Sequence, residues 1–93
     1  MNKYNFLLKY LHMESFNHLF ETNNSYILEQ IAINKRPISL NLEYLIKYGI
    51  NITDEFILNN IADLMQESYY ELKIKELEKT YPKEKIITLL ENL

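Results

Sequence analysis

The stretch SYILEQIAINKRPISLNLEYLIKYGINITDEF, residues 25–56, decides the fold of this 93-residue chain. Apolar residues recur at helical spacing on both sides of the basic segment NKRP, residues 34–37, where Pro37 stops a preceding helix and Asn34 suits a left-handed cap. Gly49 is a strong C-terminal cap, and Thr53 opens a further helix whose first turn is acidic. The pattern predicts three consecutive helices, at about residues 25–33, 39–48 and from 53 onward.

The sequence before this stretch predicts two more helices, over about residues 3–12 and 15–22, each with one apolar stripe. Asn23 and Asn24 separate the second of them from the helix that begins near residue 25. Asparagine tolerates the left-handed backbone that a tight turn needs. We therefore expect a tight left-handed turn at these two asparagines.

The sequence after residue 56 continues the helix that opens at Thr53, to about Lys79 or to a bend near the tyrosine pair 69–70. Pro82 marks the first turn of a last helix, whose apolar positions include Leu93. One glycine and two prolines are too few for a sheet with several tight hairpins. The expected fold class is all-α, a compact bundle of five to six helices in a single domain.

The net charge of −3 is unevenly distributed along the chain. Residues 35–49 sum to +2, whereas residues 50–71 carry five carboxylates and no lysine or arginine. An acidic total disfavours tight non-specific binding to nucleic acid, which depends on neutralising phosphates. The acidic total does not exclude a localised basic edge near residue 35.

Several classes of site are disfavoured by the residues themselves. There is no cysteine, so disulfides and thiolate metal sites are excluded. His12 and His18 are six residues apart, which is not the spacing of a helical metal pair. No nucleophile motif surrounds the serines or histidines. We therefore expect no enzyme activity, no metal and no cofactor.

The N-terminus has only short apolar runs, broken by Lys9, His12 and Glu14. Such runs are typical neither of a secretion signal nor of a membrane span. We expect a cytoplasmic protein with no membrane partner.

Residues 25–57 resemble the second half of Cro/repressor-like (lambda repressor-type) helix-turn-helix domains. The resemblance is carried by Gln30-Ile31, by Asn34-Lys35-Arg36-Pro37, by Ser39-Leu40 and by the segment from Gly49 to Phe56. The pheromone-type regulators of Gram-positive bacteria are similar around RPISL. The resemblance to repressor-type domains implies a divergent helix-turn-helix core over residues 1–65, with a helical extension over residues 66–93. The divergence lies at Leu19-Phe20 and Thr22-Asn23-Asn24, where the family has a small residue and a glycine-containing turn.

The resemblance implies that the helix over residues 25–33 is a recognition helix that enters the major groove of double-stranded DNA. Its exposed polar residues would face base edges, and the two cations after it would contact phosphates. The expected DNA-binding residues are Asn24, Ser25, Tyr26, Glu29, Gln30, Lys35 and Arg36. The implied function is a small transcriptional regulator of repressor type, encoded by a phage or mobile element.

Other interpretations of the same residues stay open. Lys35 and Arg36 are also typical of a solvated basic turn, and Glu29 and Gln30 of ordinary helix surface. The acidic net charge favours a small inhibitor that binds another protein, such as an anti-CRISPR-like protein, an antitoxin or an immunity protein. A structural or oligomerising module is the third class.

The apolar stripe of residues 66–93 must be buried somewhere. It can fold back on the first helix or pair with a second copy of the chain. A two-fold homodimer would match a palindromic operator, and we favour it.

Overall fold

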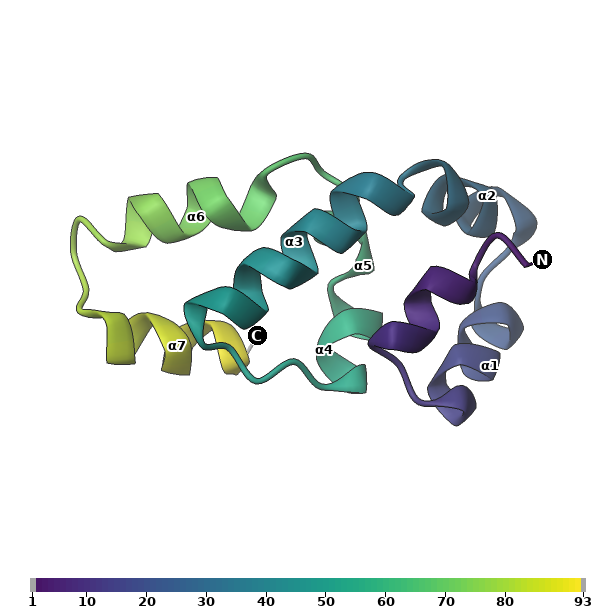
Figure 1. Ribbon diagram of the computed structural model, residues 1–93, viewed down its shortest axis with the longest axis horizontal. Coiled ribbons are helices and arrows are strands. Elements are labelled where there is room, and N and C mark those ends of the chain that lie inside the picture. Colours follow the sequence, from purple (N-terminus) through teal and green to yellow (C-terminus); the bar gives the residue numbers. More distant parts are fainter. Residues whose placement is uncertain (1, 93) are drawn as a thin grey trace.

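The computed structural model describes residues 2–92, and within that range it contains helices and no strand (Figure 1). The all-α fold class is therefore confirmed, although the helices are shorter and more numerous than expected. The elements are the 3-10 helix η1 (Asn5–Lys9) and the α-helices α1 (Met13–Thr22), α2 (Ser25–Ile33), α3 (Lys35–Tyr48), α4 (Asp54–Asn59), α5 (Ile61–Leu64), α6 (Tyr69–Leu77) and α7 (Lys83–Glu91). The expected apolar position at Leu93 lies outside the described residues.

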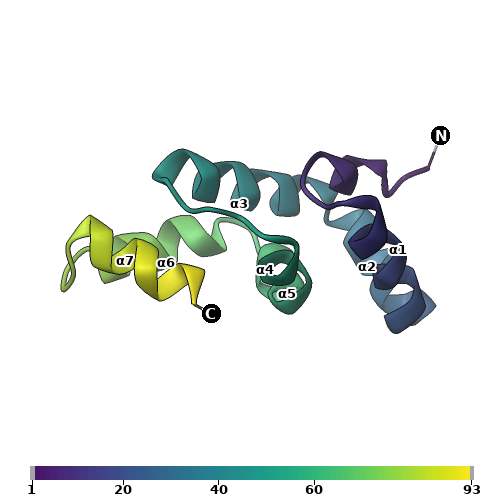
Figure 2. The same ribbon diagram turned by 90° about the horizontal axis from the view of Figure 1, so that it is seen from below.

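The longest helix, α3, is the axis of the molecule and packs against α2, α5 and α6. Figure 1 shows η1, α1 and α2 at one end and α6 with α7 at the other. Figure 2 shows α1 and α2 directed away from the end of α3, and Figure 1 shows that the two helices are separated, with η1 next to α1. The molecule is elongated, with extents of 41 × 23 × 20 Å.

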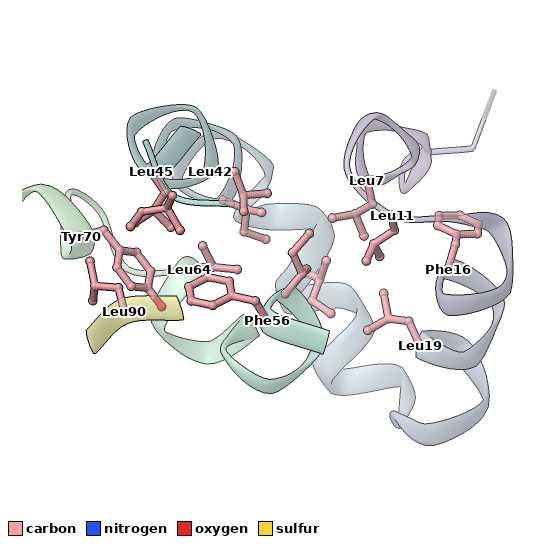
Figure 3. Packing of buried hydrophobic residues seen from close by; sticks show 14 of the residues in the cluster. Leu7, Leu11, Phe16, Leu19, Leu42, Leu45, Phe56, Leu64, Tyr70 and Leu90 are labelled. Atoms are coloured by element: carbon pink, nitrogen blue, oxygen red, sulfur yellow. The ribbon is translucent and has the colours of Figure 1, made fainter. Parts of the chain in front are cut away.

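One continuous hydrophobic core runs through this arrangement (Figure 3). Leu42 and Leu45 of α3 are fully buried, as expected from the stripe of that helix. Ile74 of α6 and Ile86 of α7 are also fully buried. The C-terminal extension thus folds back within its own chain, but onto α3 and not, as expected, onto the first helix, which lies at the other end of the molecule (Figure 1). A homodimer stays a prediction, but these side chains do not need one for burial.

The first expected helix, over residues 3–12, is wrong in type and length. It is the five-residue 3-10 helix η1, in which bonds such as Tyr10 N–H to the Leu7 carbonyl span three residues. Leu7 and Leu11 are nevertheless buried, as the apolar stripe predicts. The segment ends where His12 turns extended to precede α1.

The expected left-handed turn at Asn23 and Asn24 is also wrong, because both residues are extended. The Asn24 side chain accepts a hydrogen bond from the Ile27 N–H at 2.9 Å. Asn24 is therefore the N-cap of α2, and an N-cap residue requires extended backbone.

The basic segment of residues 34–37 is helix rather than turn. Helix α3 begins at Lys35, four positions before the expected start, and Asn34 is not left-handed (φ −97°, ψ 26°). Pro37 is tolerated because it lies in the first turn of α3, where no backbone N–H is needed for the helix. Only Asn34 therefore separates α2 from α3.

Both caps expected beyond α3 are confirmed. Gly49 has φ +112°, a conformation that residues with a side chain rarely adopt. The Thr53 hydroxyl accepts the Phe56 N–H at 3.1 Å and opens α4. An unbroken helix from Thr53 to Lys79 is wrong, because the segment is divided into α4, α5 and α6. The alternative, a bend near the tyrosine pair 69–70, agrees with the start of α6 at Tyr69.

Candidate functional site

Helix α2 carries most of the expected DNA-binding residues and has one face open to solvent. Tyr26 is 69% exposed and Ile33 is 65% exposed, although both are large and largely apolar. The opposite face is held by Ile31, which is fully buried, with Ile27 and Leu28 packed partly against the core. The exposed face is therefore fixed in orientation by the buried one.

The first two expected residues lie at the N-terminus of α2. The Asn24 side-chain oxygen is occupied by the Ile27 N–H, so only its amide nitrogen is left to donate to a ligand. Ser25 is exposed in the first turn. Both residues are exposed, and Asn24 also serves as the N-cap of α2.

Glu29 is not a free carboxylate. It pairs with the Lys3 ammonium at 2.7 Å, and both side chains are more than half exposed. The hydrogen bond to Glu29 is the main reason that the pKa of Lys3 is raised. This pair ties the N-terminal segment to α2 and partly neutralises the negative charge on the exposed face.

Gln30 and Ile33 complete the exposed face with Tyr26. Residues at i, i+4 and i+7 lie on one side of an α-helix, and Gln30 is partly buried between the two exposed neighbours. Sequence reasoning missed Ile33 as a surface residue. The signal was its seven-residue spacing from Tyr26, which places it opposite the buried Ile31.

Lys35 and Arg36 lie in the first turn of α3 and are exposed. Within residues 2–92, neither has a carboxylate oxygen within 4 Å of its charged nitrogens. The Lys35 ammonium instead lies 5.8 Å from the centre of the Phe6 ring. Cations at a helix N-terminus are repelled by the helix dipole. An anion at this point would be attracted by both side chains and by the dipole.

The structure thus brings five of the seven expected DNA-binding residues together on one surface. They are Ser25, Tyr26, Gln30, Lys35 and Arg36. The stripe consists of Tyr26, Gln30 and Ile33, and Ser25 lies at its start. Only Asn34 separates the end of the stripe from the two cations. Residues 2–36 carry four cations and three carboxylates, whereas residues 37–92 carry six cations and ten carboxylates. The α1–α2 end is therefore the less acidic end of the molecule.

Other chemistry is sparse in the described part of the chain. Residues 2–92 contain no cluster of three or more histidines, aspartates and glutamates placed to hold a metal ion. His12 contacts Asp54 through its ring nitrogen Nδ1, 2.9 Å from the carboxylate, and this pair links the start of α1 to α4.

Comparison with protein-family models, with curated proteins and with solved structures finds no match to this chain. The resemblance to repressor-type domains therefore stays a prediction from the sequence. None of the helices between residues 2 and 92 combines the length and the apolar character that crossing a bilayer requires.

Proposed function

We propose that α2 and the first turn of α3 bind double-stranded DNA, and that the protein is a small transcriptional regulator of repressor type. The observation that carries the proposal is the stripe of α2, followed after Asn34 by two exposed cations that have no carboxylate partner among the described residues. Helix α2 is supported by its packing on α3, and α1 precedes it across a two-residue connection.

In this arrangement the contacts divide into two kinds. Gln30 would pair with adenine, and the exposed apolar surface of Ile33 and Tyr26 suits the methyl group of thymine. Lys35 and Arg36 would contact phosphates and fix the register without reading sequence. The ion pair between Glu29 and Lys3 lowers the repulsion that a free carboxylate would meet in the groove.

Two cations in each chain give a weak electrostatic contribution to binding. Each neutralised phosphate contributes about −0.9 to the slope of log K against log salt on duplex DNA. A homodimer would double the phosphate contacts and present two copies of α2 to a palindromic site. We therefore propose that the protein binds its operator as a homodimer.

Sequence-selective binding is tested by fluorescence anisotropy at low salt, with a duplex from upstream of the protein's own gene and a scrambled duplex. Gln30→Ala should reduce the preference between the two duplexes, because it removes a base contact and leaves the phosphate contacts intact. Glu84→Gln on α7, at the other end of the molecule, is the control. Equal affinity of the unmodified protein for both duplexes would contradict sequence reading by α2.

A protein-directed inhibitor is the second candidate, favoured by the same exposed side chains. Tyr26, Ile33 and Arg36 combine an aromatic residue, an aliphatic residue and an arginine, a combination that suits a protein interface. Absence of DNA binding at low salt with micromolar protein would favour this candidate. Tyr26→Ala and Ile33→Ala would then be the variants that abolish binding to its target.

A further inference from the structure

A groove of about 450 Å³ lies between α3 and the N-terminal end of α6, away from the α2 stripe. Its apolar surface comes from Leu40, Tyr44 and Ile46 of α3. Leu40 is 52% exposed and Ile46 is 46% exposed, although both are large aliphatic residues. The volume falls in the range of pockets that hold a ligand or the anchoring side chain of a partner.

The wall of this groove is held in place by a buried amide. Asn41, 2% exposed, donates to the carbonyls of Leu64 and Gln66 at 2.9 and 2.8 Å and accepts the Tyr70 N–H at 3.2 Å. These three bonds fix both ends of the connection between α5 and α6. The groove therefore exists before any partner binds, so little ordering is needed on binding.

Ser68, in the same connection, has the left-handed conformation φ +58°, ψ +21°. It is the only residue other than glycine with positive φ within residues 2–92. Residues in such conformations cost free energy and cluster at sites that bind ligands. Here the unusual residue lines the groove.

One of the carboxylates at the groove is open to a cationic occupant. Glu43, Glu67 and Glu71 line it, against the single ammonium of Lys47. Glu43 is paired with Lys9 at 3.3 Å and Glu71 with Lys75 at 3.0 Å. Glu67 is exposed and has no cation within 4 Å among the described residues. It is the carboxylate most available to a partner.

We propose that this groove binds a segment of a partner protein that presents a large apolar side chain flanked by lysine or arginine. The apolar side chain packs on Leu40 and Tyr44, and a flanking cation pairs with Glu67. This mode resembles the docking of an amphipathic segment in a hydrophobic groove. The groove and the α2 stripe share no residue, so the proposal is independent of DNA binding.

The test is an NMR titration of the full chain with a short amphipathic peptide of leucine and lysine, and with its twin in which glutamate replaces every lysine. The lysine peptide should cause saturable shifts of the amide signals of Leu40, Tyr44 and Ser68, and the glutamate twin should not. Leu40→Ser and Glu67→Lys should each weaken binding about five- to tenfold, since an apolar contact and a charge pair are lost.

Leu72→Ser and Glu84→Lys are matched controls, because both residues are exposed and lie outside the groove. They should leave the affinity for the lysine peptide within about twofold, a change of less than about 0.5 kcal/mol. Equal binding of the glutamate twin, equal weakening by the controls, shifts confined to α2, or no saturable shift at millimolar peptide would each overturn the proposal.

Discussion

At the scale of single residues, the buried tyrosine of α6 carries a polar group inside the hydrophobic core. Tyr70 is 1% exposed, its ring centre lies 5.9 Å from that of Phe56, and its hydroxyl has no hydrogen-bond partner among residues 2–92. Figure 3 shows the hydroxyl oxygen inside the core, near Leu90 and Phe56. Tyr10 is the natural comparison, because its hydroxyl donates to the Glu43 carboxylate at 2.5 Å.

Tyr70→Phe should leave the free energy of unfolding unchanged or raise it by up to about 1 kcal/mol, since it removes an unpaired buried group. Tyr10→Phe should lower it by about 1 kcal/mol, since it removes a hydrogen bond to a charged acceptor at the surface. Urea unfolding of the two variants and the unmodified protein measures both effects. A loss of more than about 1 kcal/mol in Tyr70→Phe would show that the hydroxyl is satisfied.

Asn41 should be the most sensitive polar residue of the chain. Asn41→Ala removes three buried hydrogen bonds and should lower the free energy of unfolding by about 2–4 kcal/mol. It should also speed amide exchange in residues 64–70. Asn59→Ala on exposed surface is the control, expected to change stability by less than about 0.5 kcal/mol. A similar loss of stability in both variants would contradict the role of Asn41 in holding the connection between α5 and α6.

The asparagines also show what the sequence could not reveal at this scale. Asn24 caps α2, Asn34 donates to the Gln30 carbonyl at the end of α2, and Asn41 joins two distant segments. The first two were expected at helix boundaries, although in the wrong backbone conformation. The role of Asn41 could not be predicted, because its partners lie more than twenty residues away in the chain.

At the scale of elements, the sequence predicted the features that depend on neighbouring residues. It did not predict those that depend on residues distant in the chain. Gly49 and Thr53 act through neighbouring backbone groups, so both caps could be recognised in the sequence. A bend near the tyrosine pair 69–70 was one of two expectations, and α6 begins at Tyr69. The sequence could not decide between them, because apolar spacing continues across the break and the break is held by hydrogen bonds to the distant Asn41. Pro37 misled because proline is compatible with the first turn of a helix as well as with a stop.

The same limit applies to the candidate site. The pattern placed Tyr26, Lys35 and Arg36 on the surface, and the structure agrees. It did not predict the ion pair between Glu29 and Lys3, which joins residues 26 positions apart. The seven-residue spacing from Tyr26 favours the exposed face for Ile33, but it does not settle the position, since the last turn of a helix can face core or solvent.

The contact between α1 and α4 should make stability depend on pH. The Asp54 carboxylate accepts bonds from the His12 backbone N–H and from its ring. Burial acts to raise the pKa of Asp54, but hydrogen bonds from the His12 ring, from Ser15 and from the His12 backbone outweigh it and lower the pKa below its usual 3.8. A lowered pKa in the folded state stabilises the fold above the pKa of the unfolded chain. That contribution is lost as pH falls through the folded value.

Asp54→Asn should therefore be less stable than the unmodified protein at pH 7, and it should lose less stability on acidification to below about pH 3.8, the ordinary pKa of the side chain. Urea midpoints at the two pH values measure the difference. Glu55→Gln, exposed in the same helical turn, is the control. The same pH dependence in Asp54→Asn as in the unmodified protein would contradict a lowered pKa of Asp54.

At the scale of the whole molecule, the two ends that share one hydrophobic core differ in charge. The α1–α2 end carries the stripe and the two free cations, whereas the chain from residue 37 onward holds most of the carboxylates. An acidic body repels DNA, so contact with the duplex should be confined to the α1–α2 end. We therefore expect weak, salt-sensitive binding of DNA per chain and tighter binding by a dimer.

The most direct test is the salt dependence of DNA affinity for the unmodified protein and for the double variant Lys35→Ala/Arg36→Ala. We expect salt-sensitive binding whose slope of log K against log salt falls in magnitude by about 2 per chain in the double variant. Lys79→Ala/Lys85→Ala, at the α6–α7 end, should leave the slope unchanged. No binding at low salt, or the same slope in both double variants, would contradict DNA binding through α2 and the first turn of α3.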